Sequence, residues 1–598
     1  MLAEETIQGY ALSPQQKRLW DWQQQQNTNF RAKCLVSISG NLDGAFGTGP
    51  FSYGDATRTD HRDRLYASIQ SICDRHEILR STFQRHVGMQ YPLQVVSEHA
   101  TFDWEVRDLQ ELNSEQQQAQ IEQIANAPAS PSENPLQVWL LPTAPEKSFL
   151  LLSLPALCAD RTTFNILVAE LSDLYATGGE NILPELEIVQ YSQVSQWQYE
   201  VLSEFKTETG EEFWQPSNLE RYSTPGLPKL ETPKSQKGCD RYSLHLEPEF
   251  LEKLEKAAQN YDSSLEDWLF SAWQTLLWQI GGRGALLTCY GSDGRPYEDL
   301  DNTAGLLTKW LPVPITLDGS WPFSETLEYV RDAQEQVLDG QDYIVAGATP
   351  LSSTNSLPVG FEFLEQPSFS ASNLTFDIQR VETTSDRFGV CLSCHRHADG
   401  LDFVFHYDAT TYAEATIARL SRHWRTLLES TVEAPDGSID RLSLLDDRDR
   451  EQLLVEFNQT QRDFPSDKCL HQLFEEQVER CSDRVALQFE QEQLTYTELN
   501  QRANQLAHHL QQEFGVGPDT LVAIGLERSA HSIVALLGIL KAGGAYVPID
   551  PGMPQQRRQR MLAEANPVAI VTQQSLQNLW EEQEIPTICL DTKYTNST

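Results

Sequence analysis

One short segment limits the folds open to this chain more than any other feature. Residues 148–154 read SFLLLSL, a continuous apolar run typical of a strand buried on both faces. A sharp segment, PALCAD, follows, and beyond it apolar residues from Phe164 to Leu174 recur at helical spacing. Asp160 and Thr162 are both candidates for the N-cap of this helix. The order strand, turn, helix predicts an α/β fold and gathers backbone N–H groups at a helix start, which can stabilise an oxyanion.

The strand and helix patterns indicate two α/β halves followed by a further unit. A second run of such patterns occupies about 240–440, and Pro, Gly and charged residues gather near 215–237 and 433–465. We therefore expect lobes at 1–180 and 181–445, a linker at 446–465 and a separate subdomain at 466–598.

Composition excludes several classes of partner. The 598 residues carry 45 Lys and Arg against 86 Asp and Glu, a formal net charge of −41. A surface this acidic repels phosphate backbones and anionic lipid, so nucleic acid and membranes are not expected partners. Ten cysteines form no dense framework, and the first residues, MLAEETIQGY, lack a signal-peptide pattern. We expect a cytoplasmic protein.

Several short motifs occur in a fixed order over about 430 residues. The longest three are SPQQKRLW at 13–20, RHEILRSTF at 75–83 and FHYDATTYAEATIARLSRHWRTLLE at 405–429. Between them stand Tyr191 with Trp197, Gly305 through Pro312, and Gln341–Tyr343. Together these segments resemble the ordered motifs of condensation domains of nonribosomal peptide synthetases.

The resemblance implies a fold and a reaction. It implies two lobes resembling chloramphenicol acetyltransferase, arranged as a V around a tunnel that the phosphopantetheine arms of carrier domains enter from both sides. The implied partners are carrier domains with their acyl or aminoacyl thioesters, together with neighbouring synthetase modules. The implied reaction is attack of an acceptor amine on a donor thioester, which forms an amide.

The C-terminal part resembles a different domain. Residues 494–504, LTYTELNQRAN, and 540–551, LKAGGAYVPIDP, are similar to the first two motifs of amino-acid adenylation domains. Adenylate formation needs a Gly-rich loop for the ATP phosphates and a lysine at the acyl phosphate. Gly552 is the last glycine. We therefore expect a truncated, incomplete α/β adenylate-forming subdomain that binds no cofactor itself, with ATP and Mg²⁺ relevant only to a full domain.

The signature segment departs from the condensation family. The family pattern is His-His-x-x-x-Asp-Gly, and alignment on Asp160 places Pro155 and Ala156 at the two histidines. Ala156 thus replaces the residue to which the family assigns the base or positioning role, and Arg161 replaces the glycine. The resemblance gives Asp160 a structural role, bracing the loop through an ion pair.

Other family positions have also changed. The fourth-motif Asp is Gln193, the fifth-motif Asn is Lys309, and the sixth-motif His is Gly340. With Cys158, these residues are candidates for the substrate tunnel. No histidine near Cys158 in sequence could activate its thiol, and we interpret it as a small residue at a buried turn.

Three functions remain open at this stage. The first is condensation with a weakened signature. Loss of a general base lowers the rate by about 10²–10⁴, whereas holding the two substrates together contributes roughly 10⁵ or more, so the reaction could continue without the base. The second is a silent module that binds a carrier or recruits a tailoring enzyme. A free-standing acetyltransferase using coenzyme A is disfavoured by the adenylation-like segment and the missing histidine. Arg161 would pair with Asp160 or another acidic tunnel residue in a silent domain, or with a carboxylate or phosphate of the substrate in an active one.

A possible metal or haem motif has a simpler explanation. Cys391, Cys394 and His395 match the haem-attachment spacing, and His397 adds a potential ligand. However, apolar residues alternate here, Asp399-Gly400 is a turn signal, and an apolar strand follows. We expect a β-hairpin and no metal or haem site.

Overall fold

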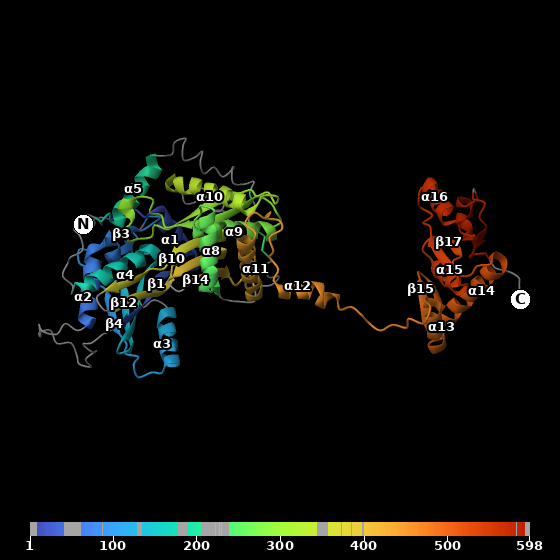
Figure 1. The fold of residues 1–598 in the computed structure, drawn as a ribbon, viewed down its shortest axis with the longest axis horizontal. Helices are drawn as coiled ribbons and strands as arrows, with labels where there is room; N and C mark the ends of the chain where they lie inside the picture. The colour runs from blue at the N-terminus through green and yellow to red at the C-terminus, as the bar shows by residue number, and fades with distance from the viewer. Residues whose placement is uncertain are drawn as a thin grey trace. The chain divides into compact units, whose positions relative to one another are not determined.

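The computed structural model divides the chain into two compact units, Met1–Glu456 and Phe457–Thr598 (Figure 1). It describes residues 9–40, 61–85, 88–127, 134–177, 188–204, 222, 226–227, 229, 239–343, 357–371, 374–383, 386–397, 400–581 and 583–592. Among these residues, no helix combines the length and the apolar character needed to cross a bilayer.

The first half of unit one is built on a six-stranded sheet with the order β11-β12-β1-β6-β5-β4. Its own strands are β1 (Arg31–Gly40), β4 (Asp103–Val106), β5 (Gln137–Ala144) and β6 (Lys147–Pro155). Among the described residues, this half also contains a small hairpin, β2 (Ser81–Gln84) and β3 (Leu93–Val96), and the helices α1 (Pro14–Gln26), α2 (His61–Arg75), α3 (Ser114–Asn126), α4 (Arg161–Ala176) and α5 (Tyr191–Glu204). The apolar run at 148–154 forms the interior strand β6, paired with β1 and β5 as its composition predicts.

The second half of unit one has a sheet of its own, with the order β7-β14-β13-β10-β8-β9. Its strands are β7 (Cys239–Leu246), β8 (Leu286–Ser292), β9 (Lys309–Ile315), β10 (Leu357–Glu365), β13 (Phe388–His397) and β14 (Gly400–Asp408). The hairpin expected around 391–408 is present, because β13 and β14 pair antiparallel from Val390 to His397.

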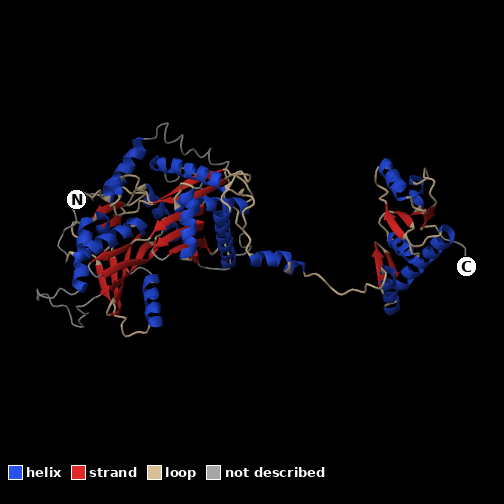
Figure 2. Cartoon of the chain, viewed as in Figure 1, coloured by secondary structure: helices blue, strands red, loops and turns tan. Residues whose placement is uncertain are grey.

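Helices cover one face of this second sheet (Figures 1 and 2). They are α8 (Pro248–Asn260), α9 (Leu265–Ile280), α10 (Phe323–Asp339) and α11 (Glu414–Glu433). Apolar residues of alternate positions, including Phe361, Leu392 and Phe405, join the core formed with these helices. Because side chains alternate along a strand, the intervening residues Glu362 and Ser393 lie on the opposite face.

The two halves exchange strands. β11 (Ser368–Ala371) and β12 (Leu374–Glu382) follow β10 in sequence but belong to the first sheet, where β12 pairs antiparallel with β1. Without β12, the apolar strand β1 would be an open sheet edge, which proteins avoid. The first sheet therefore contains strands from both sides of the expected lobe boundary at residue 180.

Unit two is a smaller α/β unit. Its parallel sheet has the order β18-β17-β19-β20. The strands are β17 (Leu521–Gly525), β18 (Ala545–Pro548), β19 (Ala569–Thr572) and β20 (Thr587–Cys589), beside a hairpin of β15 (Val485–Phe489) and β16 (Glu492–Thr495). The helices are α13 (Leu470–Arg480), α14 (Tyr496–Phe514), α15 (Ala530–Lys541) and α16 (Gln555–Ala565), while a short α12 (Asp447–Leu454) lies in unit one.

Candidate functional site

The signature segment connects β6 to α4 in the interior of unit one. The backbone N–H of Ala156 donates to the Phe30 carbonyl at 3.0 Å, which continues the β1–β6 pairing for one residue. A short 3-10 helix, Ala156–Cys158, then turns the chain, and Asp160 is the N-cap of α4. Ala156 and Cys158 are both fully buried. The strand, turn and helix thus occur at the residues that the sequence pattern predicts.

Asp160 joins the two halves of unit one. One carboxylate oxygen accepts from the Thr163 backbone N–H at 2.8 Å, which caps α4. The other accepts from the backbone N–H groups of Leu307 and Thr308, at 2.9 and 3.1 Å. The Arg295 guanidinium adds a bidentate pair with distances of 3.0 and 3.2 Å. Contacts from both halves therefore fix the position of the segment.

The Asp160–Arg295 pair is buried, and its surroundings favour the ionised form of Asp160. The two side chains are 2% and 1% exposed. Burial acts to raise the pKa of Asp160, but the Arg295 charge and the hydrogen bonds from Arg295 and Thr163 outweigh it and hold that pKa below its ordinary value. The guanidinium also donates to the carbonyl oxygens of Thr303 and Asp293. These bonds satisfy donors that would otherwise be left unpaired in the interior.

Neither Ala156 nor Cys158 provides a reactive group. The methyl group of Ala156 cannot accept a proton. Burial raises the pKa of the Cys158 thiol to about 12, so it remains protonated at neutral pH and is a poor nucleophile.

Arg161 brings a positive charge to the start of α4. The side chain is partly buried, and the acidic group that acts on it most strongly is Glu362 of β10. Glu362 accepts a hydrogen bond from Ser393 of β13, on the face of the second sheet opposite the helices. Burial lowers the pKa of Arg161, and the Glu362 carboxylate opposes that shift. The guanidinium therefore has an acidic neighbour within the protein.

Two partly buried histidines share this environment: His395, which the sequence analysis weighed only within a rejected haem-attachment pattern, and His406, which it did not single out. Burial and the charge of Arg161 lower the pKa of His395 well below its ordinary value and lower that of His406 to about 4. Both imidazoles are therefore neutral at physiological pH. No local sequence signal relates them to Arg161, because only the strand register and the packing of α4 bring these residues together.

The remaining tunnel candidates do not all gather in one place. Lys309 is buried and its Nζ lies 2.7 Å from Asp342, next to Gly340, which caps the C-terminus of α10. Gln193 is exposed on α5, and its side chain accepts from the Gln190 backbone N–H. Lys309 and the segment that begins at Gly340 thus lie together, while the hydrogen bond of Gln193 is local to the N-terminus of α5.

The ordered motifs contact one another around the signature segment. Gln16 of α1 donates to the Leu157 carbonyl at 2.9 Å. Ser13, the N-cap of α1, bonds the Tyr191 hydroxyl at 2.8 Å, and that hydroxyl donates to Leu306 O. His76, of the motif at 75–83, is buried and lies 2.9 Å from Glu170 of α4. Motifs far apart in sequence therefore support a single region.

Comparison with known proteins identifies the family. The family described as Condensation domain matches residues 6–454, about three quarters of the sequence. The chain belongs to the condensation domain family. The family described as AMP-binding enzyme matches residues 474–597, so the order is condensation and then adenylation, as the motifs predict.

Similar proteins are nonribosomal peptide synthetases. A linear gramicidin synthase of Brevibacillus parabrevis is 29% identical across 97% of this chain, and Chondramide synthase cmdD of Chondromyces crocatus is 31% identical across 85%. The chain spans only 8% and 14% of these two relatives. The solved structure of holo-AB3403, a four domain nonribosomal peptide synthetase bound to AMP and glycine, matches 99% of this chain and 45% of its own length, with a TM-score of 0.73 and 17% identity. These comparisons support the expected α/β fold class.

Proposed function

We propose that this condensation domain joins a carrier-bound thioester donor to an amine acceptor without an imidazole base. The observation that carries the proposal is the bracing of the signature segment by Asp160 and Arg295, with Ala156 at the position of the base. The bracing of the segment supports a positioning role, whereas Ala156 offers no group that could accept the proton of the amine.

The missing base slows the reaction without removing its main source of rate. Amide formation requires the acceptor ammonium to lose a proton, its nitrogen to attack the thioester carbonyl, and the thiol to leave. An α-amine with a pKa near 7.7–8.0 is already partly neutral at physiological pH. Holding the two substrates together is worth roughly 10⁵ or more, against about 10²–10⁴ for a general base. Slow but measurable turnover is the expected result.

The proposed partners follow from the family and its relatives. Carrier domains would present both substrates on phosphopantetheine arms, and neighbouring synthetase modules would supply those carriers. An adenylation domain needs ATP and Mg²⁺, and this requirement would apply to the AMP-binding segment as part of a complete domain.

A silent, carrier-binding module is the second candidate. The observation that favours it is the charge of Glu362, the acidic group that acts most strongly on Arg161, because it offsets part of the guanidinium charge without an anionic substrate. The family has glycine at this position, so the longer side chain would narrow a substrate path. In this case the domain would bind loaded carriers and form no amide.

Single-turnover amide formation between two defined loaded carriers distinguishes the candidates. The wild type, Ala156→His, Arg161→Gly and the double variant are compared, with Ala159→His as a control that places an imidazole elsewhere in the same segment. We expect slow turnover by the wild type and about 10²–10⁴ faster turnover by the double variant. Turnover only in variants with Arg161→Gly would favour the silent module. Absence of turnover in every variant would contradict the condensation proposal and the idea that this segment alone decides turnover.

A further inference from the structure

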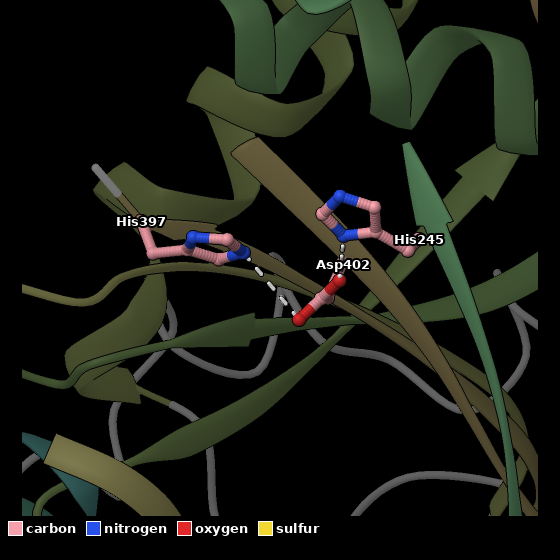
Figure 3. A group of neighbouring side chains, drawn as sticks. All are labelled: His245, His397 and Asp402. Carbon is pink, nitrogen blue, oxygen red and sulfur yellow. Dashed lines mark hydrogen bonds and ion pairs between the residues drawn. The ribbon is translucent and has the colours of Figure 1, made fainter. Parts of the chain in front are cut away.

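Three side chains meet at one end of the second sheet. They are His245 of β7, Asp402 of β14 and His397 of β13, and Figure 3 shows both imidazoles beside the carboxylate. His245 is directly opposite Asp402 in the register, and His397 is opposite Gly400, two residues away on the same face. Three adjacent strands thus contribute one side chain each.

Gly400 leaves the space that this arrangement needs. A Cβ atom at position 400 would lie 3.1 Å from Cε1 of His245. With glycine there, the rings of His245 and His397 stack, with their centroids 6.0 Å apart. The two imidazoles can therefore reach the same carboxylate from neighbouring strands.

The distances between the polar atoms suit a bound metal ion. Nδ1 of His245 lies 2.7 Å from one oxygen of Asp402, and Nε2 of His397 lies 3.4 Å from the other. One ligand atom from each of the three residues lies within 4.8 Å of the others. In a tetrahedral zinc site with bonds of about 2.0–2.1 Å, the ligand atoms are about 3.3 Å apart. Small side-chain rotations would bring these three atoms to that spacing.

A second observation is that Nε2 of His397 has no hydrogen-bond partner among the described residues of the protein. This atom is buried, and it is oriented toward Asp402. Buried polar nitrogens are nearly always hydrogen-bonded or coordinated. The His245 side chain is 53% exposed and that of Asp402 42%, so an ion could enter from solvent.

We propose that His245, His397 and Asp402 bind Zn²⁺ and fasten the edge strand β7 to the β13–β14 hairpin. Two imidazoles and one carboxylate are a donor set that zinc commonly takes, with water as a fourth ligand. The inference differs from the sequence expectation of no metal site, which concerned Cys391, Cys394 and their neighbours. It is independent of whether the condensation site turns over.

Zinc binding to the purified chain tests this site. The metal-stripped chain is titrated with ZnSO₄ against a chromophoric chelator, and the wild type is compared with His245→Ala, His397→Ala and Asp402→Asn. His423→Ala is the matched control, because His423 lies 3.6 Å from one carboxylate, that of Asp449. We expect one zinc per chain, affinity at least about tenfold weaker in each of the three variants, and no change in the control.

Two further readouts separate a specific site from thiol binding. Zinc should raise the midpoint of thermal unfolding in the wild type but not in Asp402→Asn. Cobalt(II) should give the d–d bands of a four-coordinate site without a thiolate charge-transfer band. The proposal would be overturned if the wild type and Asp402→Asn bound zinc equally well, or if neither bound it. A thiolate charge-transfer band in the cobalt spectrum would also overturn it.

Discussion

Replacing Arg295 with methionine removes the cation that stabilises the buried Asp160 carboxylate. The two side chains are 1% and 2% exposed, and their oxygen and nitrogen atoms lie 3.0 and 3.2 Å apart in a bidentate pair. Breaking a buried ion pair by removing one partner typically costs about 3–5 kcal/mol, because the remaining charge is uncompensated. We expect a loss of that size in the stability of unit one.

The corresponding change in melting temperature is small because the unit is large. Unit one covers Met1–Glu456, and unfolding entropy is about 2.1 cal/mol/K per residue, which gives roughly 1 kcal/mol/K for the unit. A loss of about 3–5 kcal/mol therefore lowers the midpoint by about 3–5 °C. Urea denaturation followed by far-ultraviolet circular dichroism gives the free energy directly.

The pH dependence separates electrostatics from packing. In the wild type the folded pKa of Asp160 is below its unfolded value, so this carboxylate stabilises the fold above pH 4 and the contribution is lost as pH falls through the folded pKa. Without Arg295, burial raises the pKa of Asp160, and protonation removes the uncompensated charge. The difference between Arg295→Met and wild type should therefore shrink as pH falls toward 4.

A surface pair provides the matched control. Arg107 lies 2.5 Å from Glu105, and both side chains are 48% exposed. Such pairs contribute about 0–1 kcal/mol, so Arg107→Met should have little effect. The account of Asp160 would be refuted if Arg295→Met lost no more free energy of unfolding than Arg107→Met. It would also be refuted if the difference in unfolding free energy between Arg295→Met and wild type did not change with pH.

Two further predictions concern the same region. Gly305 has a φ of +152°, and a Cβ atom there would lie 2.0 Å from the Tyr191 ring. Gly305→Ala should therefore lower the free energy of unfolding of unit one, measured in urea, by more than about 2 kcal/mol, whereas Gly226→Ala, where a Cβ meets no atom within 4 Å, should be nearly neutral. Equal losses of stability in the two variants would contradict this prediction. Because burial raises the pKa of Cys158 to about 12, iodoacetamide at pH 8 should label the exposed Cys469 and spare Cys158 until the chain unfolds. Labelling of Cys158 in the native chain at a similar rate would show that the turn opens.

Local signals in the sequence were sufficient for the strand, turn and helix around Asp160. An apolar run, a capping residue and a helical period act over a few residues, so they predict β6, the turn and α4 without tertiary information. The ordered motifs added the family and its fold, because they span the whole of the condensation domain.

The partners of these residues could not be predicted in the same way. Arg295 lies 135 positions from Asp160, and nothing in its local sequence indicates a buried pair. Glu362 reaches the neighbourhood of Arg161 because of the strand register of the second sheet. The insertion of β12 beside β1 likewise depends on long-range pairing rather than on local periodicity.

The pH dependence of single-turnover amide formation tests the central claim most directly. With Ala156 at the position of the base, the rate should rise once with pH, and the inflection should follow the amine pKa as acceptors of different basicity are used. His395 and His406 have lowered pKa values and would not titrate near pH 6.5. Ala156→His should add an inflection near that pH. A wild-type inflection that stays near pH 6.5 for every acceptor would reveal an imidazole base and contradict the account.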